Sequence, residues 1–76
     1  MDAKLRQLLA DVFEQQPSLI QEQLTAEDIR SWDSLKHVQL VLALEQTYGI
    51  RLDTDEIAEI RGVKDIIETL HRHEAL

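Results

Sequence analysis

Three residues of one short segment, Asp33, Ser34 and His37, are of the types that form a serine-hydrolase triad. Nothing around them resembles the Gly-x-Ser-x-Gly turn that exposes a nucleophilic serine, and a chain of 76 residues has little room for a substrate pocket with an oxyanion hole. We therefore expect Asp33 to cap a helix, Ser34 to be its first residue and His37 to point toward a helical core. A hydrolase is a remote alternative, and we expect the chain not to be an enzyme.

Ser34 could instead be the attachment point of a phosphate ester. An ester-linked phosphate on a serine at a helix start would meet free backbone N–H groups and the positive end of the helix dipole. This attachment needs no base on the chain itself, because a separate enzyme could perform the transfer. The alternative is a serine of the cap region with no further role. Trp32, just before the cap, either anchors the loop on the core, which we favour, or frames a group attached at Ser34.

The spacing of acids and histidines does not predict a metal site. His71 and His73 are two residues apart, so on a helix their side chains diverge by about 200°. The acidic run over residues 53–59 begins like a calcium-binding loop, but Ala58 and Lys64 stand where that loop needs Gly and Glu. We interpret the run as a solvated, helix-capping surface.

The composition limits the partners. Fifteen acids oppose eight bases, and the formal net charge of −7 disfavours nucleic acid and anionic membrane surfaces and favours a basic patch on another protein. No apolar run approaches the roughly 20 residues of a membrane span. The absence of cysteine is typical of a cytoplasmic protein. We expect a single domain over residues 1–76, which at this size has one compact core.

Apolar spacing predicts three main helices and one short helix. Leu5, Leu8, Leu9, Val12 and Phe13 share one helical face, which predicts a helix over about 3–15, ended by Pro17. The clearest helix covers about 34–48, between the Asp33 cap and Gly49. A short helix to Ile60 and a last helix over about 63–73 follow. The fold class is therefore all-α, a small four-helix bundle without strands.

Residues 17–33 form a long connection without sustained periodicity. Thr25 to Asp28 could cap a single turn, with Asp28 as a short stand-in for the usual Glu. Four apolar side chains are expected to pin this connection to the core: Leu19, Ile20, Leu24 and Ile29. A connection of this length in a compact domain is often functional.

A helical wheel separates the faces of the helix over 34–48. At 100° per residue, one side is the core face, made by His37, Leu40, Val41, Leu44 and Tyr48. Leu35 and Leu42 fall on the outer side, next to Val38 and Glu45. These two leucines are either ordinary surface residues or a docking stripe for a partner, and the wheel alone does not separate the two.

Three motifs occur in order along the chain, Trp-Asp-Ser-Leu at 32–35, Val-Gln-Leu-Val-Leu-Ala-Leu-Glu at 38–45 and Tyr-Gly-Ile at 48–50, and the short acidic helix and the final helix follow them. In this combination the sequence resembles the acyl carrier protein family. The resemblance covers essentially the whole chain in length, helix order and acidity. Asp-Ser-Leu alone is a weak motif, whereas the combination is specific.

The resemblance implies a carrier that delivers a cargo and does not catalyse. Ser34 would receive 4′-phosphopantetheine from coenzyme A through a separate phosphopantetheinyl transferase, and Asp33 would cap the helix beside it. The thiol of the arm would hold an acyl group as a thioester for biosynthetic enzymes of a fatty-acid, polyketide or other specialised pathway. An aminoacyl, peptidyl or D-alanyl carrier is the alternative within the class, and an unmodified helical adaptor is the alternative outside it.

The resemblance also implies a partner surface on a stand-alone monomer. Acyl-loading and acyl-accepting enzymes with basic patches would dock on Leu35, Val38, Gln39, Leu42 and Glu45. Many fatty-acid carriers have an acid after the Ser-Leu pair and further Glu along this helix, where this chain has Lys36, His37, Gln39 and Gln46. This weaker negative charge, together with Trp32, favours a specialised pathway over a housekeeping one. Gly62 replaces a common Ser or Thr cap, so we expect the last helix to start loosely.

Overall fold

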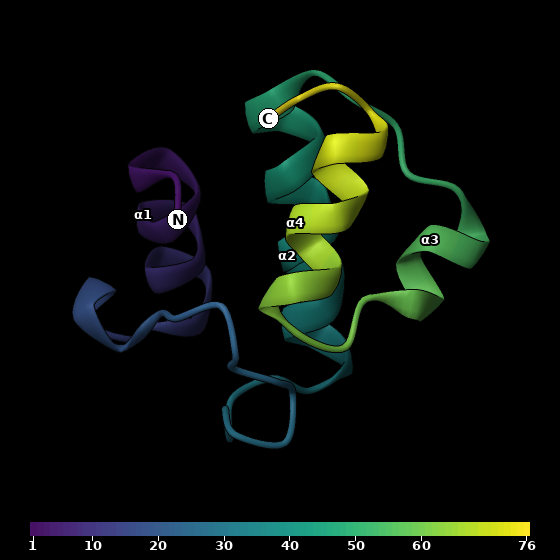
Figure 1. Ribbon diagram of the computed structural model, residues 1–76. Coiled ribbons are helices and arrows are strands. Elements are labelled where there is room, and N and C mark those ends of the chain that lie inside the picture. The colour runs from purple at the N-terminus through teal and green to yellow at the C-terminus, as the bar shows by residue number, and fades with distance from the viewer.

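The computed structural model describes residues 1–76 as four α-helices and one 3₁₀ turn (Figure 1). The elements are α1 (Ala3–Phe13), η1 (Pro17–Leu19), α2 (Ser34–Tyr48), α3 (Thr54–Glu59) and α4 (Val63–Arg72). The predicted all-α class with one short helix is confirmed. An isolated antiparallel bridge between Thr25 and Gly62 is the only strand-like pairing. No helix has both the length and the apolar character required to cross a bilayer.

Helix α1 begins as expected but ends early. Its cap is Asp2, whose carboxylate accepts the N–H of Leu5 at 2.9 Å. The prediction that Pro17 ends a helix reaching residue 15 is wrong. Glu14 adopts a left-handed conformation with φ of 56°, and its N–H bonds to the Ala10 carbonyl, which closes the helix at Phe13. Pro17 instead opens η1, a position that suits its fixed φ and missing N–H.

Helix α2 has the predicted bounds and faces. Gly49 ends it in the left-handed conformation, with φ of 64°, where a glycine has no steric penalty. Leu40, Val41 and Leu44 are buried, as the wheel predicts, whereas the outer side is exposed. The two ends of the core face, His37 and Tyr48, are half-buried at the rim.

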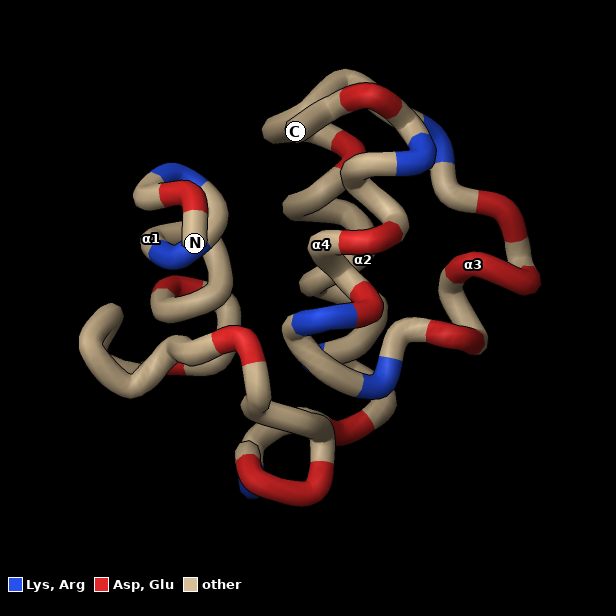
Figure 2. The backbone as a smooth tube through the Cα atoms, in the orientation of Figure 1, with Lys and Arg blue, Asp and Glu red and all other residues tan.

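Helix α3 is short, acidic and fixed by its own cap. Asp53 and Glu56 form a reciprocal capping box, in which each carboxylate accepts the other residue's backbone N–H. Acidic positions cover much of α3 in Figure 2. In Figure 1, α3 stands to one side of the other helices. Ile60 is buried and Ile57 is half-buried, so these two side chains attach α3 to the core.

The connection between α1 and α2 is pinned by fewer side chains than expected. Ile20 and Ile29 are buried and Leu24 is half-buried against the core, but Leu19 is 54% exposed. The expectation for Leu19 is wrong, because η1 turns its side chain toward solvent.

The turn predicted at Thr25 to Asp28 is present. The Asp28 carboxylate accepts the backbone N–H of Thr25 at 2.9 Å and the Thr25 hydroxyl at 3.1 Å. The Asp28 carboxylate therefore makes the capping hydrogen bond that a longer Glu usually makes at this position.

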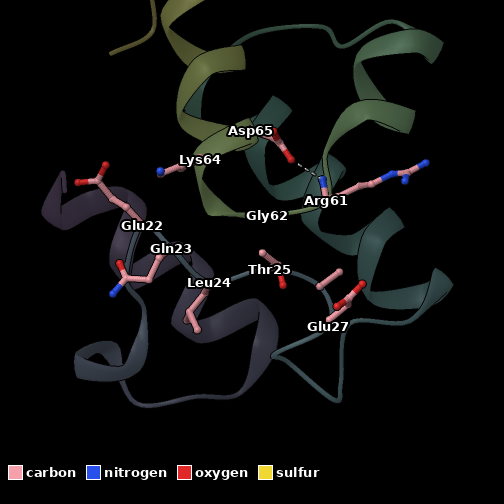
Figure 3. Close-up of a pocket in the computed structure, with 10 residues that line it drawn as sticks. Glu22, Gln23, Leu24, Thr25, Glu27, Arg61, Gly62, Lys64 and Asp65 are labelled. Atoms are coloured by element: carbon pink, nitrogen blue, oxygen red, sulfur yellow. Dashed lines mark hydrogen bonds between the residues drawn. The ribbon is translucent and has the colours of Figure 1, made fainter.

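The start of α4 is held by backbone contacts rather than by a side-chain cap. Val63 donates its N–H to the Leu24 carbonyl at 2.9 Å, and Ala26 donates to the Arg61 carbonyl at 2.8 Å. Figure 3 shows Gly62 beside Leu24 and Thr25 at this crossing. A Cβ at position 62 would lie 3.0 Å from the Leu24 carbonyl oxygen, so the close approach favours glycine. The expected loose start is wrong, because the bridge fixes it.

One cluster of 14 buried apolar residues joins α1, α2, α4 and the connections, and Ile57 of α3 packs partly buried against it. At its edge, the Tyr48 hydroxyl is buried without a hydrogen-bond partner, and the Lys4 ammonium lies 5.0 Å from the centre of its ring. Burial first, and then the nearby Asp2 carboxylate, raise the pKa of Tyr48 above its ordinary value of 10.0. Both observations indicate a hydroxyl that the fold keeps neutral.

The buried position of Leu44 predicts a large loss on truncation. Leu44→Ala should lower the free energy of unfolding by about 2–5 kcal/mol, because Leu44 is almost fully buried and a cavity would remain. Chemical denaturation monitored by helical circular dichroism would measure it. Leu42→Ala, at a half-exposed position on the same helix, is the control and should cost about 0.5 kcal/mol or less. Equal losses would contradict the assigned faces.

The buried hydroxyl of Tyr48 predicts a pH dependence at alkaline pH. Its folded pKa exceeds the unfolded value, so its contribution to stability is complete below about pH 10 and is lost as the pH rises through the folded pKa. Tyr48→Phe should reduce the alkaline loss of stability. Near neutral pH the variant should be as stable as the parent, or about 1 kcal/mol more stable, because an unpaired hydroxyl is removed. Unfolding curves of both proteins against pH would check this, and a variant much less stable at neutral pH would contradict it.

Candidate functional site

Ser34 is the first residue of α2, and a cap holds it there. The Asp33 carboxylate accepts the N–H of Lys36 at 2.8 Å, while the Asp33 carbonyl accepts the N–H of His37 at 2.9 Å. Ser34 itself is exposed. The N–H groups of Ser34 and Leu35 have no partner within the helix, as at any helix start, so the serine hydroxyl stands among free donors.

The three triad-type side chains are not arranged for hydrolysis. The Trp32 indole N–H donates to Nδ1 of His37 at 3.0 Å, and Nε2 of His37 lies 2.8 Å from the Ile57 carbonyl oxygen. Both ring nitrogens are therefore occupied, and neither contacts Ser34 or Asp33. An imidazole in this arrangement cannot take the serine proton as a general base.

A shallow hollow adjoins the serine. Its volume is about 330 Å³, and its walls come from the loop before α2, the first turn of α2 and the end of α3: Ala26, Trp32, Asp33, Ser34, His37, Ile60 and Arg61. Trp32 and Ile60 contribute apolar surface, whereas Arg61 contributes a fixed positive charge. Free N–H groups, a positive helix end and a guanidinium are the partners that a phosphate ester prefers. The residues present therefore fit an attached phosphate with an apolar arm beside it.

The expected position of Trp32 as an anchor is confirmed. Its ring centre lies 4.6 Å from that of Phe13 in α1, and it packs partly buried against the core. The neighbouring Ser31 hydroxyl donates to the Phe13 carbonyl at 3.2 Å. These contacts tie the residues before Asp33 to α1 and so set the direction from which the chain enters α2.

The outer side of α2 exposes an apolar stripe, defined here as Leu35, Val38 and Leu42. These side chains are 64%, 56% and 52% exposed, and Gln39 beside them is also exposed. Residues spaced by three and four share a helix face, so the stripe continues down α2 from Ser34. Exposed apolar groups in a row indicate a contact surface more strongly than scattered single ones do.

Glu45 differs from the other residues expected on this surface. It is half-buried, and its carboxylate accepts the backbone N–H of Leu52 at 2.9 Å. The carboxylate therefore holds the connection between α2 and α3 in place. This bond could not be predicted from the sequence, because the two residues are seven apart and on different elements.

The charges of the two helices next to the hollow are unequal. Helix α2 has one acid, Glu45, and one base, Lys36, which lies 3.5 Å from the Glu14 carboxylate. On α3, Asp55 and Glu59 are exposed, whereas Glu56 is engaged by His73 at 2.8 Å. Of these two helices, α3 therefore carries the exposed acids, and Asp33 adds another exposed carboxylate before α2.

Sequence reasoning missed two features of this site. Arg61 borders the hollow although it follows Ser34 by 27 positions, and the bridge at Gly62 and the hydrogen bond from Ala26 to the Arg61 carbonyl hold its backbone there. The hydrogen bond between Trp32 and His37 was also missed. In the sequence the two residues are simply five positions apart, with Trp32 before the start of α2 and His37 in its first turn.

The family model for the phosphopantetheine attachment site matches residues 3–70 of the chain. The chain belongs to this family of carrier domains. The match covers all four α-helices, and the site just described lies within it. Members of this family bear a covalently attached phosphopantetheine, and they are carriers rather than catalysts.

Known carriers resemble the chain over most of their length. The acyl carrier protein of Thermosynechococcus vestitus is 29% identical over 69 residues, which is 90% of this chain and 84% of that protein. The acyl carrier protein of Syntrophobacter fumaroxidans is 29% identical over 75 residues, covering 99% and 93% of the two chains. The solution NMR structure of a holo acyl carrier protein from Geobacter metallireducens superposes with a TM-score of 0.83 at 28% identity, over 95% of this chain and 83% of that one. Carriers of this kind interact with phosphopantetheinyl transferases and acyl-processing enzymes.

Proposed function

We propose that this carrier domain is an acyl carrier protein that bears 4′-phosphopantetheine on Ser34. The observation that carries the proposal is the exposed hydroxyl of Ser34 as the first residue of α2, next to a hollow that suits a phosphate and an apolar arm. The thiol of the attached arm supplies the point at which an acyl group is held as a thioester. The named relatives are acyl carrier proteins, which favours an acyl cargo over an aminoacyl one.

The other serines are poorer candidates. The chain has three, and the Ser31 hydroxyl is already bonded to the Phe13 carbonyl in a half-buried position. Ser18 lies inside the three-residue η1 turn, which ends after one more residue and offers no long helix dipole. Ser34 alone combines exposure with the start of a 15-residue helix.

At Ser34 the roles of the neighbouring residues follow from their contacts. The Ser34 oxygen forms the new bond to phosphorus as the phosphoanhydride bond of coenzyme A breaks, the adenosine bisphosphate leaves, and the serine proton passes to the transferase. Asp33 keeps the helix start in register, and the free N–H groups stabilise the phosphate charge. A tethered cargo then meets each partner at a high effective concentration.

We further propose that acyl-processing partners dock on the apolar stripe and on the acidic side of α3. The stripe begins next to Ser34, so an enzyme seated on it has the arm within reach. Exposed ion pairs contribute about 0–1 kcal/mol each, but together they steer encounter and select partners. Because Lys36 offsets the one acid of α2, basic groups on such a partner would meet Asp55 and Glu59 of α3. We extend the proposal to a cytoplasmic monomer serving a specialised pathway.

Attachment at Ser34 is tested by intact mass. Incubation with coenzyme A, magnesium and a broad-specificity phosphopantetheinyl transferase should add one phosphopantetheine to the parent chain and none to Ser34→Ala. Ser18→Ala, an exposed serine outside the site, is the matched control and should be modified like the parent. Modification of Ser34→Ala, or none of the parent, would reject the proposed site.

The docking surface is tested by a charge placed on the stripe. Leu42→Asp should lower kcat/KM of an acyl-loading partner about ten-fold or more, because an apolar contact is lost and a carboxylate is buried without a partner. Helical circular dichroism should stay nearly unchanged, since Leu42 is half-exposed. Gln46→Asp adds the same charge at an exposed position on another side of α2 and should have a much smaller effect. Equal effects of the two variants would mean that charge alone, and not the stripe, is being sensed.

A further inference from the structure

His37 occupies a constrained position among three elements. Its Nδ1 is 3.0 Å from the Trp32 indole nitrogen, in the loop before α2, and its Nε2 is 2.8 Å from the Ile57 carbonyl oxygen, in α3. An indole N–H can only donate and a carbonyl oxygen can only accept. Nδ1 must therefore present a lone pair and Nε2 must bear the hydrogen. The two partners together select one tautomer of the neutral imidazole.

These contacts surround the attachment site. Trp32 stands two residues before Ser34, and both line the hollow together with His37. The indole ring is stacked near the imidazole, with centres 6.2 Å apart and planes inclined by 25°, and its centre lies 4.6 Å from that of Phe13. Trp32 thus contacts α1 through Phe13, and it contacts α2 through His37 by ring stacking and by one hydrogen bond.

We propose that His37 is a positioning residue for the attachment site and that it makes the position of Trp32 depend on pH. Protonation places a hydrogen on Nδ1, the atom that accepts the indole N–H, so two N–H groups then oppose each other. The hydrogen bond between Trp32 and His37 must break, whereas the Nε2–H can remain bonded to Ile57. Trp32 is released from α2 while α3 stays attached. The effect of this change on Ser34 rests on the phosphopantetheine attachment proposed above. The change in the hydrogen bond between Trp32 and His37 does not depend on that proposal.

No ionic partner is bonded to the imidazole in a way that would replace the lost bond. The charged side chains that line the hollow with the ring are Asp33 and Arg61. The neighbouring elements also bear Lys36 on α2, Glu14 after α1, and Asp55, Glu56 and Glu59 on α3. The Asp33 carboxylate accepts the backbone N–H of Lys36, and the ammonium of Lys36 pairs with Glu14. Glu56 is engaged by His73. The ring nitrogens thus have only the indole nitrogen of Trp32 and the carbonyl oxygen of Ile57 as hydrogen-bond partners.

The chain contains one tryptophan, which reports the switch directly. The indole N–H resonance and the fluorescence of the apo protein would be followed as the pH is lowered from about 8 to about 5. Both signals should change together with the ring resonances of His37. His37→Gln should remove the dependence, because the glutamine amide offers an acceptor to Trp32 and a donor to Ile57 at every pH in this range. His71→Asn, an exposed histidine of α4, is the matched control and should retain it.

A second measurement connects the switch to Ser34. The rate of phosphopantetheine attachment would be compared between the parent and His37→Gln at each pH, so that the transferase's own pH dependence cancels in the ratio. The parent should lose about five-fold relative to the variant on acidification, the effect of one lost hydrogen bond. Trp32→Phe lacks the indole N–H donor. The ratio of its attachment rate to that of His37→Gln should therefore not depend on pH. Circular dichroism would establish that both variants fold.

An indole resonance that is indifferent to the titration of His37, or one that shifts equally in His37→Gln, would overturn the switch. If the parent gains no phosphopantetheine at all, the proposed attachment fails. The indole titration of the apo protein then still decides whether the switch exists, so the two failures are distinguishable.

Discussion

The hydrogen bond between the Asp33 carboxylate and the Lys36 N–H determines where α2 begins, and much of the site depends on it. A helix advances by about 100° per residue, so the residue at which it starts decides which side chains face the core. With the start at Ser34, Leu40 and Leu44 are buried, while Leu42 is exposed. The same start leaves the Ser34 hydroxyl among the free N–H groups of the first turn. One cap thus fixes both the proposed attachment point and the surface beside it.

The rest of the site is assembled by contacts between elements that are distant in the sequence. The bridge at Gly62 brings the end of α3 to the loop before α2, and Arg61 reaches the hollow as a result. On the other side, Trp32 joins α1 to α2 through Phe13 and His37. These contacts supply the apolar walls and the positive charge that a helix start alone would lack. Removing one of them would change the hollow without changing the helix that holds Ser34.

The unequal charge of α2 and α3 bears on which enzymes this carrier can serve. With Lys36 and a single acid, α2 attracts a basic surface weakly, so in the proposed docking the acids of α3 are the main steering charges. In that docking, a partner that needs several acids along α2 would lack its ion pairs, whereas a partner with a complementary apolar groove could still bind the stripe. The proposal thus assigns selectivity to the distribution of charge, since the net charge of −7 says nothing of where the acids lie.

The amino-acid sequence by itself determined those features that depend on near neighbours in the chain. Helix periodicity and short-range caps at Asp33, Gly49 and Asp53 predicted the class of fold, the bounds of α2 and the position of Ser34, because both signals act within a few residues. The end of α1, the exposed side of Leu19 and the firm start of α4 were mispredicted, since each depends on how the connection folds back. The bonds of Glu45 to Leu52 and of Trp32 to His37, and the place of Arg61, were decided only by the tertiary structure. A hydrogen bond or an ion pair needs its two groups within a few ångströms, and only the packing of separate elements brings these groups that close.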